Sequence, residues 1–183
     1  METLTKNDVK VWSVDSTHSS IHFAVKHMVI AQTKGSFADY KLKVESEGDD
    51  FSNAKIELEI EVNSINTSMP DRDNHLRSAD FFDAEKYPAI KFVSKSMTKV
   101  TDEDYKLTGD ITIKGITRPI EFNVNYGGQL VDPWGNTRAG FTIEGAIDRF
   151  DFGLNWNSLL EAGGAVVGKT VKLQAEIELV AVK

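Results

Sequence analysis

TVKLQAEIELVAV, residues 170–182, alternates between apolar and mostly polar side chains along its whole length. At helical spacing the segment would carry Gln174 and Glu178 on its apolar stripe, whereas an extended chain places every second residue on one face. The alternation therefore predicts a long β-strand. Its apolar face is formed by Val171, Leu173, Ala175, Ile177, Leu179 and Ala181.

The same period of two recurs along most of the chain. KIELEIEV (55–62) sets aliphatic side chains on one face against a lysine and glutamates on the other. Gly115, the pair 127–128 and the run 132–136 are residues typical of hairpin turns between such strands. The other alternating segments are IHFAVKH (21–27), DYKLKVE (39–45), KLTGDITIKG (106–115), IEFNVNY (120–126) and GFTIEGAID (140–148).

These segments predict eight or nine long antiparallel strands, each with one apolar and one polar face. A sheet of that size must close or fold over, because its apolar face and its edges need cover. An eight-stranded barrel has an interior just wide enough for side chains or for one small ligand. The predicted fold class is therefore all-β, with an eight-stranded antiparallel barrel favoured over a two-sheet sandwich.

Two segments break the alternation. SMPDRDNHLRSADFF (68–82) begins with Ser68 three residues before an aspartate, which resembles a capping box, and predicts a short helix across a barrel end. FGLNWNSLLEAGG (152–164) is predicted to hold a second short helix that ends at its two glycines. Residues 1–8 are expected to be an N-terminal extension, and residues 9–183 a single domain.

Composition excludes several classes of function. The chain has 183 residues, 40% of them hydrophobic and 27% charged, as is typical of a soluble globular protein. The net charge of -7 argues against broad binding to nucleic acid or to anionic membranes. With no cysteine, disulfides, thiolate catalysis and iron–sulfur clusters are excluded. No apolar run approaches the roughly 18 residues of a membrane span, so stable membrane insertion is not expected.

The N-terminus, METLTKNDVK, has no apolar core of a secretory signal. The expected location is therefore cytoplasmic, or periplasmic if a signal has been removed.

DSTHSSIHFAVKH (15–27) holds three of the four histidines and suggests a metal site. On a strand, however, His18 and His22 would lie about 13 Å apart, too far for one zinc ion. His27 lies an odd number of residues from His22 and so falls on the opposite face. We expect no metal here, with His18 in a turn with Asp15 and Ser19, and His27 inside the barrel.

GGAVVGKT (163–170) fits the phosphate-loop pattern G-x-x-x-x-G-K-T letter for letter. That motif binds phosphate only where a helix follows the loop, whereas here an alternating strand follows. Nucleotide binding is therefore not expected. No G-x-S-x-G nucleophile motif occurs either, and no catalytic residue is predicted.

Segment 72–77 concentrates Arg72, His75 and Arg77 in a net-acidic chain. Pairing of Arg72 with its neighbouring aspartates is the simplest interpretation. The alternative is an anion clamp at a cavity mouth, because guanidinium groups bind phosphate oxygens well. Arg149 is a comparable candidate for a ligand headgroup.

Four blocks resemble a known family: WSVDSTHSSIHFAVKHM (12–28), RDNHLRSADFFDAEKYP (72–88), LTGDITIKGITRPIEF (107–122) and RAGFTIEGAIDRFDFGLNW (138–156). In this order they are similar to the YceI-like family. The resemblance implies an extended lipocalin-like eight-stranded barrel whose internal tunnel holds a polyisoprenoid or a similar amphiphile. It also implies a homodimer, and it carries over no catalytic motif.

The sequence therefore predicts a non-catalytic protein that carries a long-chain isoprenoid lipid, such as a quinone or a prenyl phosphate, and needs no cofactor. Two alternatives stay open: a metal-dependent hydrolase using His18, His22 or His27, and a solid-cored, stress-associated interaction module without a ligand. The side chains expected to contact the ligand are Ile21, Phe23, Val25, His27, Leu42, Leu58, Ile60, Phe92, Ile111, Phe122, Val124, Phe141, Ile143, Leu173 and Ile177.

Overall fold

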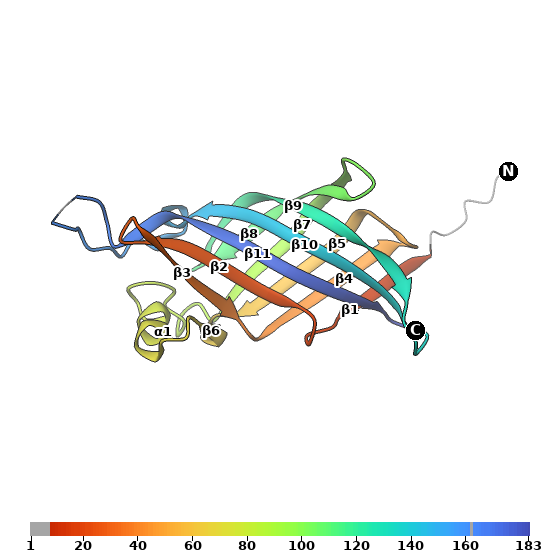
Figure 1. Ribbon diagram of the computed structural model, residues 1–183, viewed down its shortest axis with the longest axis horizontal. Coiled ribbons are helices and arrows are strands. Elements are labelled where there is room, and N and C mark those ends of the chain that lie inside the picture. Colours follow the sequence, from red (N-terminus) through yellow and green to blue (C-terminus); the bar gives the residue numbers. More distant parts are fainter. Residues whose placement is uncertain (1–7, 162) are drawn as a thin grey trace.

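The computed structural model describes residues 8–161 and 163–183. One helix, α1, and eleven strands are found in this part of the chain (Figure 1). The helix is Pro70–Arg77. The strands are β1 (Val9–Val14), β2 (Ser20–His27), β3 (Ala31–Phe37), β4 (Tyr40–Glu47), β5 (Asp50–Glu61), β6 (Ile65–Asn66), β7 (Ala89–Lys99), β8 (Asp104–Ile113), β9 (Ile116–Val131), β10 (Thr137–Asp148) and β11 (Val167–Ala181).

The strands close into an antiparallel barrel, as the alternation predicted. The wall runs β1-β4-β5-β7-β8-β9-β10-β11, and pairing of β1 with β11 closes it. β2 and β3 lengthen the wall at one end, because β2 pairs with β11 and β3 pairs with both β2 and β6. Three pairs of strands thus share one position each in the wall: β1 with β2, β3 with β4, and β5 with β6. Together with β7, β8, β9, β10 and β11 they make eight positions. The sandwich alternative is excluded by this closure.

Across β4, β5 and β7 the outer face of the barrel alternates in charge from strand to strand. Lys41 and Lys43 on β4 lie opposite Glu59 and Glu57 on β5, and Glu59 lies opposite Lys91 on β7. Opposite charges across a strand pair stabilise the register, while the aliphatic side chains between them face inward. The alternation in KIELEIEV (55–62) therefore gives the wall a charged outer face and an aliphatic inner face.

Gly127–Gly128 does not form a turn, in contrast to the prediction. β9 continues through both glycines, and the register shifts there because Gly140 faces Gly128 while Phe141 faces Tyr126. The extra residue is a β-bulge, a role that glycine commonly takes within a strand. The hairpin turn lies further on, at the predicted run 132–136.

The predicted second helix is also wrong. A short 3₁₀ turn spans Arg149–Phe152, and no helix follows it in residues 153–161 or 163–166. Asn157 instead bridges both backbone groups of Val167 with its side-chain amide, at 2.8 and 3.0 Å. Residues 167–170 of the phosphate-loop pattern already belong to β11, which confirms that a strand and not a helix follows the pattern.

Helix α1 lies at the end of the barrel where β2 turns into β3 (Figure 1). It is shorter than predicted, and Met69 rather than Ser68 is its N-cap, without a side-chain hydrogen bond. The local anchor is Asp73, which is buried and accepts hydrogen bonds from the Thr67 amide at 2.9 Å and hydroxyl at 2.5 Å. No helix in the described residues is long and apolar enough to cross a membrane.

Replacing Asp73 with alanine is expected to lower the free energy of unfolding by about 2 kcal/mol, because the buried Thr67 amide loses its acceptor. Urea unfolding followed by circular dichroism measures the change. The matched control is Asp71→Ala on the exposed side of the same helix, expected to cost less than about 0.5 kcal/mol. Equal losses in the two variants would contradict the anchoring role of Asp73.

Candidate ligand-binding cavity

The barrel encloses a cavity of about 180 Å³. For comparison, a dry cavity of about 150 Å³ in an engineered protein admits benzene. Almost the whole wall is apolar. Its lining residues are Ile21, His22, Phe23, Phe37, Leu42, Val44, Phe51, Ala54, Ile56, Leu58, Ile60, Ile90, Phe92, Met97, Leu107, Ile111, Ile113, Phe122, Val124, Phe141, Ile143, Leu173, Gln174, Ala175, Ile177 and Leu179.

Aromatic rings close one end of the cavity. Phe51 lies at the centre of this group, with ring centroids 4.8 Å from Phe141, 5.1 Å from Trp12 and 5.7 Å from Tyr126. Trp12 is fully buried, and its indole donates a hydrogen bond of 2.8 Å to the Ser46 hydroxyl. The N–H group of a buried indole needs a hydrogen-bond acceptor, and Ser46 supplies it. This end of the cavity is therefore closely packed without leaving the indole N–H unpaired.

Toward the opposite end of the cavity, the inward side chains of β10 and β11 are less buried. Along β11 the inward side chains Leu179 and Ile177 are 2% and 9% exposed, whereas Leu173 and Val171 are only partly buried. β10 shows the same gradient, from the buried Phe141 to the partly buried Ile147. We infer from this gradient that the cavity opens at the end that holds α1 and the β2–β3 turn, whereas the aromatic rings close the other end.

The structure places every predicted ligand-contact residue at this cavity except Val25 and His27. Those two lie further along β2, toward its turn, where Val25 faces Val171 and His27 faces Val167 on β11. Phe37, Phe51, Ala54, Ile90 and Met97 line the cavity but were not predicted. Phe51 and Ala54 precede the alternating run 55–62 on β5, and the others lie on β3 and β7, so none belongs to a segment whose alternation was clear in the sequence.

Arg72 and Arg77, the predicted anion clamp, do not line the cavity. Arg72 donates from Nε to the Thr67 hydroxyl and from its guanidinium to the Thr67 carbonyl, both at 2.8 Å. Arg77 donates to the carbonyls of Asn63 and Ile65 at 3.2 and 3.1 Å. Arg72 thus ties α1 to the residue Thr67 before it, and Arg77 ties α1 to β6, in place of the predicted contact with a headgroup.

His75 is also absent from the cavity wall. Its Nε2 lies 2.8 Å from an Asp80 carboxylate oxygen, and its ring packs edge-on against Phe81 and Trp156.

The guanidinium of Arg149 is held by hydrogen bonds to the protein backbone. Its side chain is buried, at 2% exposure, and donates to the backbone carbonyls of Leu154, Trp156, Val167 and Gly168. Burial lowers the pKa of this guanidinium. The prediction placed Arg149 at a ligand headgroup, whereas the structure places it as a clamp between the 3₁₀ turn and the start of β11.

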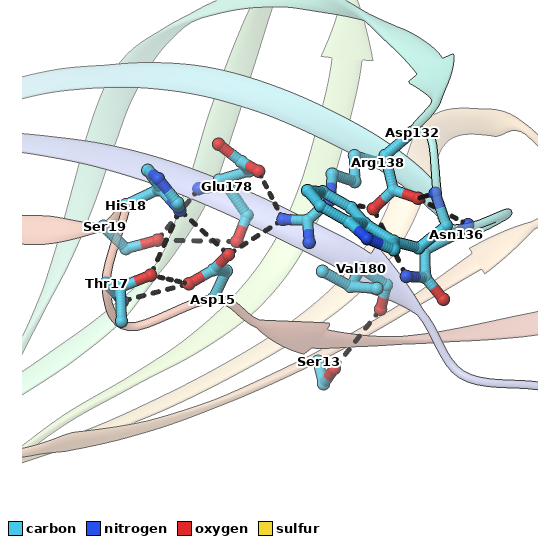
Figure 2. Close-up of polar contacts among 11 residues, drawn as sticks. Ser13, Asp15, Thr17, His18, Ser19, Asp132, Asn136, Arg138, Glu178 and Val180 are labelled. Carbon is cyan, nitrogen blue, oxygen red and sulfur yellow. Dashed lines mark hydrogen bonds and ion pairs between the residues drawn. The ribbon is translucent and has the colours of Figure 1, made fainter.

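A polar network joins the turn after β1 to β10 and β11 at the barrel wall (Figure 2). The guanidinium of Arg138 lies 2.6 Å from Asp132, 2.8 Å from Asp15 and 2.6 Å from Glu178. His18 Nδ1 lies 3.0 Å from Asp15, as expected for a turn, while the Ser19 hydroxyl pairs with the backbone of Glu178 instead.

Asp15, His18 and Glu178 form the group in the described residues that has metal-ligand spacing. Arg138 already balances both carboxylates, so the group holds together as an ion-pair network. His22 and His27, the other histidines of the hydrolase alternative, are not part of it. Among residues 8–161 and 163–183, His18, His22 and His27 therefore do not come together in the cluster that alternative requires.

This network predicts a pH dependence of stability. Hydrogen bonds from Arg138 lower the pKa of Asp132 to about 2, and the pKa of Asp15 is also lowered, by Thr17, His18 and Arg138. A carboxylate with a depressed pKa stabilises the fold above its unfolded pKa and loses that contribution as pH falls through the folded value. The free energy of unfolding of wild type should thus exceed that of Arg138→Gln by the largest amount at neutral pH. This difference should shrink between about pH 4 and pH 2.

Urea unfolding at a series of pH values measures this difference. Arg118→Gln is the control, because the exposed Arg118 donates only to the neighbouring Thr117 carbonyl. A difference for Arg138→Gln that stays constant from neutral to acidic pH would contradict the role of the network.

Comparison with known proteins agrees with the geometry. The family model of the YceI-like domain matches residues 12–179. The chain belongs to the YceI-like domain family. Within it, a UPF0312 protein of Staphylococcus aureus (strain MSSA476) is 40% identical over 168 residues, which cover 91% of this chain and 95% of that protein.

Solved structures share the YceI-like barrel. The YCEI protein of Campylobacter jejuni matches with a TM-score of 0.76 and 32% identity, covering 86% of this chain and 90% of that one. Burkholderia cenocepacia BcnA matches with a TM-score of 0.78 and 21% identity, over 90% and 98% of the two chains. A polyisoprenoid binding domain from Saccharophagus degradans, implicated in plant cell wall breakdown, matches with a TM-score of 0.65 and 14% identity, over 93% and 98%. The last two show the fold alone.

Proposed function

We propose that this YceI-like protein is a non-catalytic carrier that binds the apolar tail of an isoprenoid amphiphile inside its barrel. The observation that carries the proposal is an apolar cavity that is closed by aromatic rings at one end and bordered by less buried strand residues at the other, where we infer its opening. A tail can enter such a cavity while its polar group stays at the open end, in contact with water.

The energetics favour a long apolar ligand over a small polar one. Each buried methylene contributes about 0.8 kcal/mol, so a tail segment of ten carbons contributes about 8 kcal/mol before the cost of association is subtracted. The wall offers almost no hydrogen-bonding group to a polar molecule. A tail longer than the cavity extends toward the open end, past Val25 and Val171.

The Saccharophagus degradans domain supports the ligand class, since it is described as polyisoprenoid binding and has the same fold. The headgroup class, a quinone or a prenyl phosphate, is part of the proposal. Because Arg149, Arg72 and Arg77 are held by backbone carbonyls, the headgroup is expected to remain largely solvated.

Native mass spectrometry of the protein purified from cells tests the proposal. We expect bound lipids whose masses differ by whole isoprene units, and transfer of a prenyl lipid to the stripped protein on incubation. Protein that carries no lipid and takes up none would overturn the carrier function.

The predicted homodimer stays a prediction, and sedimentation velocity of the full chain tests it.

A further inference from the structure

Four large apolar side chains project into solvent at the open end of the barrel. Met28, Val29 and Ile30 lie in the β2–β3 turn and are 44%, 55% and 91% exposed, and Leu159 in the neighbouring loop is 87% exposed. We call these four side chains the apolar tip. The turn and the loop are in contact, because the Met28 amide donates to the Val166 carbonyl at 2.9 Å. Figure 1 shows both segments beyond the ends of β10 and β11.

The backbone of the turn makes these side chains unexpected. Met28 and Val29 have φ angles of 51° and 68°, a region that favours glycine and asparagine and that a β-branched residue rarely adopts. Such strain persists where the surroundings or the function require it. Glycine or asparagine would relieve the strain and keep the turn polar, so the apolar side chains stand here at a cost to stability.

Lysines lie behind the apolar tip on the outer face of the wall. Lys172 on β11, Ala24 on β2 and Lys34 on β3 are neighbours in register, and Lys26 lies two residues from Ala24 on the same face. All three lysines are exposed, and none forms an ion pair with a described residue. In segments 26–34 and 158–172, Glu161 is the sole carboxylate.

The other end of the barrel has the opposite charge. Its turns carry EGDD (47–50) and DED (102–104), although Trp134, Val131 and Leu130 there are also exposed, at 78%, 66% and 62%. The chain is thus acidic overall, but the β2–β3 hairpin and the start of β11 beside the apolar tip are basic, while the α1 segment at the same end is net acidic. Apolar side chains with lysines behind them match the acyl and phosphate layers of an anionic bilayer.

We propose that the apolar tip and Lys26, Lys34 and Lys172 dock this protein on an anionic lipid bilayer, with the open end of the cavity toward the membrane. A second copy fits less well, because a stable interface buries about 800 Å² on each partner and four side chains on two turns supply less. The docking itself goes beyond the proposed carrier function. Its use in loading lipid from the membrane rests on that function.

Co-sedimentation with vesicles of phosphatidylcholine and phosphatidylglycerol tests the docking. The purified chain is expected to bind these vesicles, and to bind more weakly to pure phosphatidylcholine or at high salt. Ile30→Ser combined with Leu159→Ser should weaken binding by about tenfold or more, and Lys26→Gln with Lys34→Gln and Lys172→Gln by about 100-fold. The matched control, Trp134→Ser, removes an equally exposed side chain from the acidic end and should bind as wild type does.

Val29→Asn separates docking from folding. Asparagine tolerates the positive φ, so the melting temperature should rise while vesicle binding falls several-fold. A higher melting temperature with unchanged vesicle binding would contradict a docking role for the turn.

Three further outcomes distinguish this proposal from the carrier function and from self-association. Ala175→Phe, which fills the cavity, should bind vesicles as wild type does; loss of binding there would overturn docking through the tip. Wild-type protein that binds vesicles but never carries lipid would support the docking and overturn the carrier. If the Ile30→Ser and Leu159→Ser variant breaks a dimer yet still binds vesicles, the apolar tip is a self-association surface and the proposal is wrong.

Discussion

Ala175→Phe is expected to abolish most ligand binding while the barrel stays folded. Ala175 faces the cavity between Ile21 on β2 and Ile143 on β10, and a benzyl group in its place occupies the space of the tail. Affinity for a prenyl lipid should fall by about 100-fold, the equivalent of about 2.7 kcal/mol. Overpacking should lower the free energy of unfolding by about 1–3 kcal/mol. Fluorescence titration with a prenyl lipid and urea unfolding measure the two effects.

The matched control for this variant is Ala146→Phe. Ala146 is exposed on the outer face of β10, opposite Lys172, so the added ring meets solvent. Its affinity for the lipid should equal that of wild type. Equal loss of affinity in the two variants, or full affinity in Ala175→Phe, would mean that the ligand does not occupy this cavity.

Arg149→Met is expected to lower the free energy of unfolding by about 4 kcal/mol. Removal of the guanidinium leaves the carbonyls of Leu154, Trp156, Val167 and Gly168 without their donor, and each buried unpaired group costs about 1–3 kcal/mol. Water reaches some of these carbonyls after the change, so the total is less than the sum. Urea unfolding measures the loss.

Arg118→Met is the control for Arg149→Met, with an expected change below about 0.5 kcal/mol because Arg118 is exposed. Arg149→Lys keeps the charge but cannot span four carbonyls, so it should recover only part of the loss. A wild-type stability for Arg149→Met, together with a large loss of ligand affinity, would restore the headgroup role predicted from the sequence.

The barrel and most of its cavity wall were predictable because strand geometry fixes which face a residue occupies. Once 170–182 is a strand, Leu173 and Ile177 must share a face with Ala175. Alternation does not say where along a strand a cavity begins or ends. Val25 and His27 therefore had the right face but lie beyond the cavity, toward the β2–β3 turn.

The predictions for the arginines and for the second helix differ from the structure for another reason. Arg149 and Arg77 bind backbone carbonyls, and because every residue has a carbonyl, the sequence carries no signal for such partners. In segment 152–164 the carbonyls of Leu154 and Trp156 are used by Arg149 and are not available for a helix. Positive φ at Met28 and Val29 was likewise hidden, because neither residue is typical of that conformation.

A crystal structure of the protein loaded with geranylgeranyl phosphate tests directly whether the barrel holds an isoprenoid tail. We expect continuous density inside the barrel, from the rings of Phe51 and Phe141 past Ala175 toward the β2–β3 turn, with the phosphate at the open end. A barrel filled by its own side chains, with the lipid absent or bound on the outer surface, would contradict this expectation.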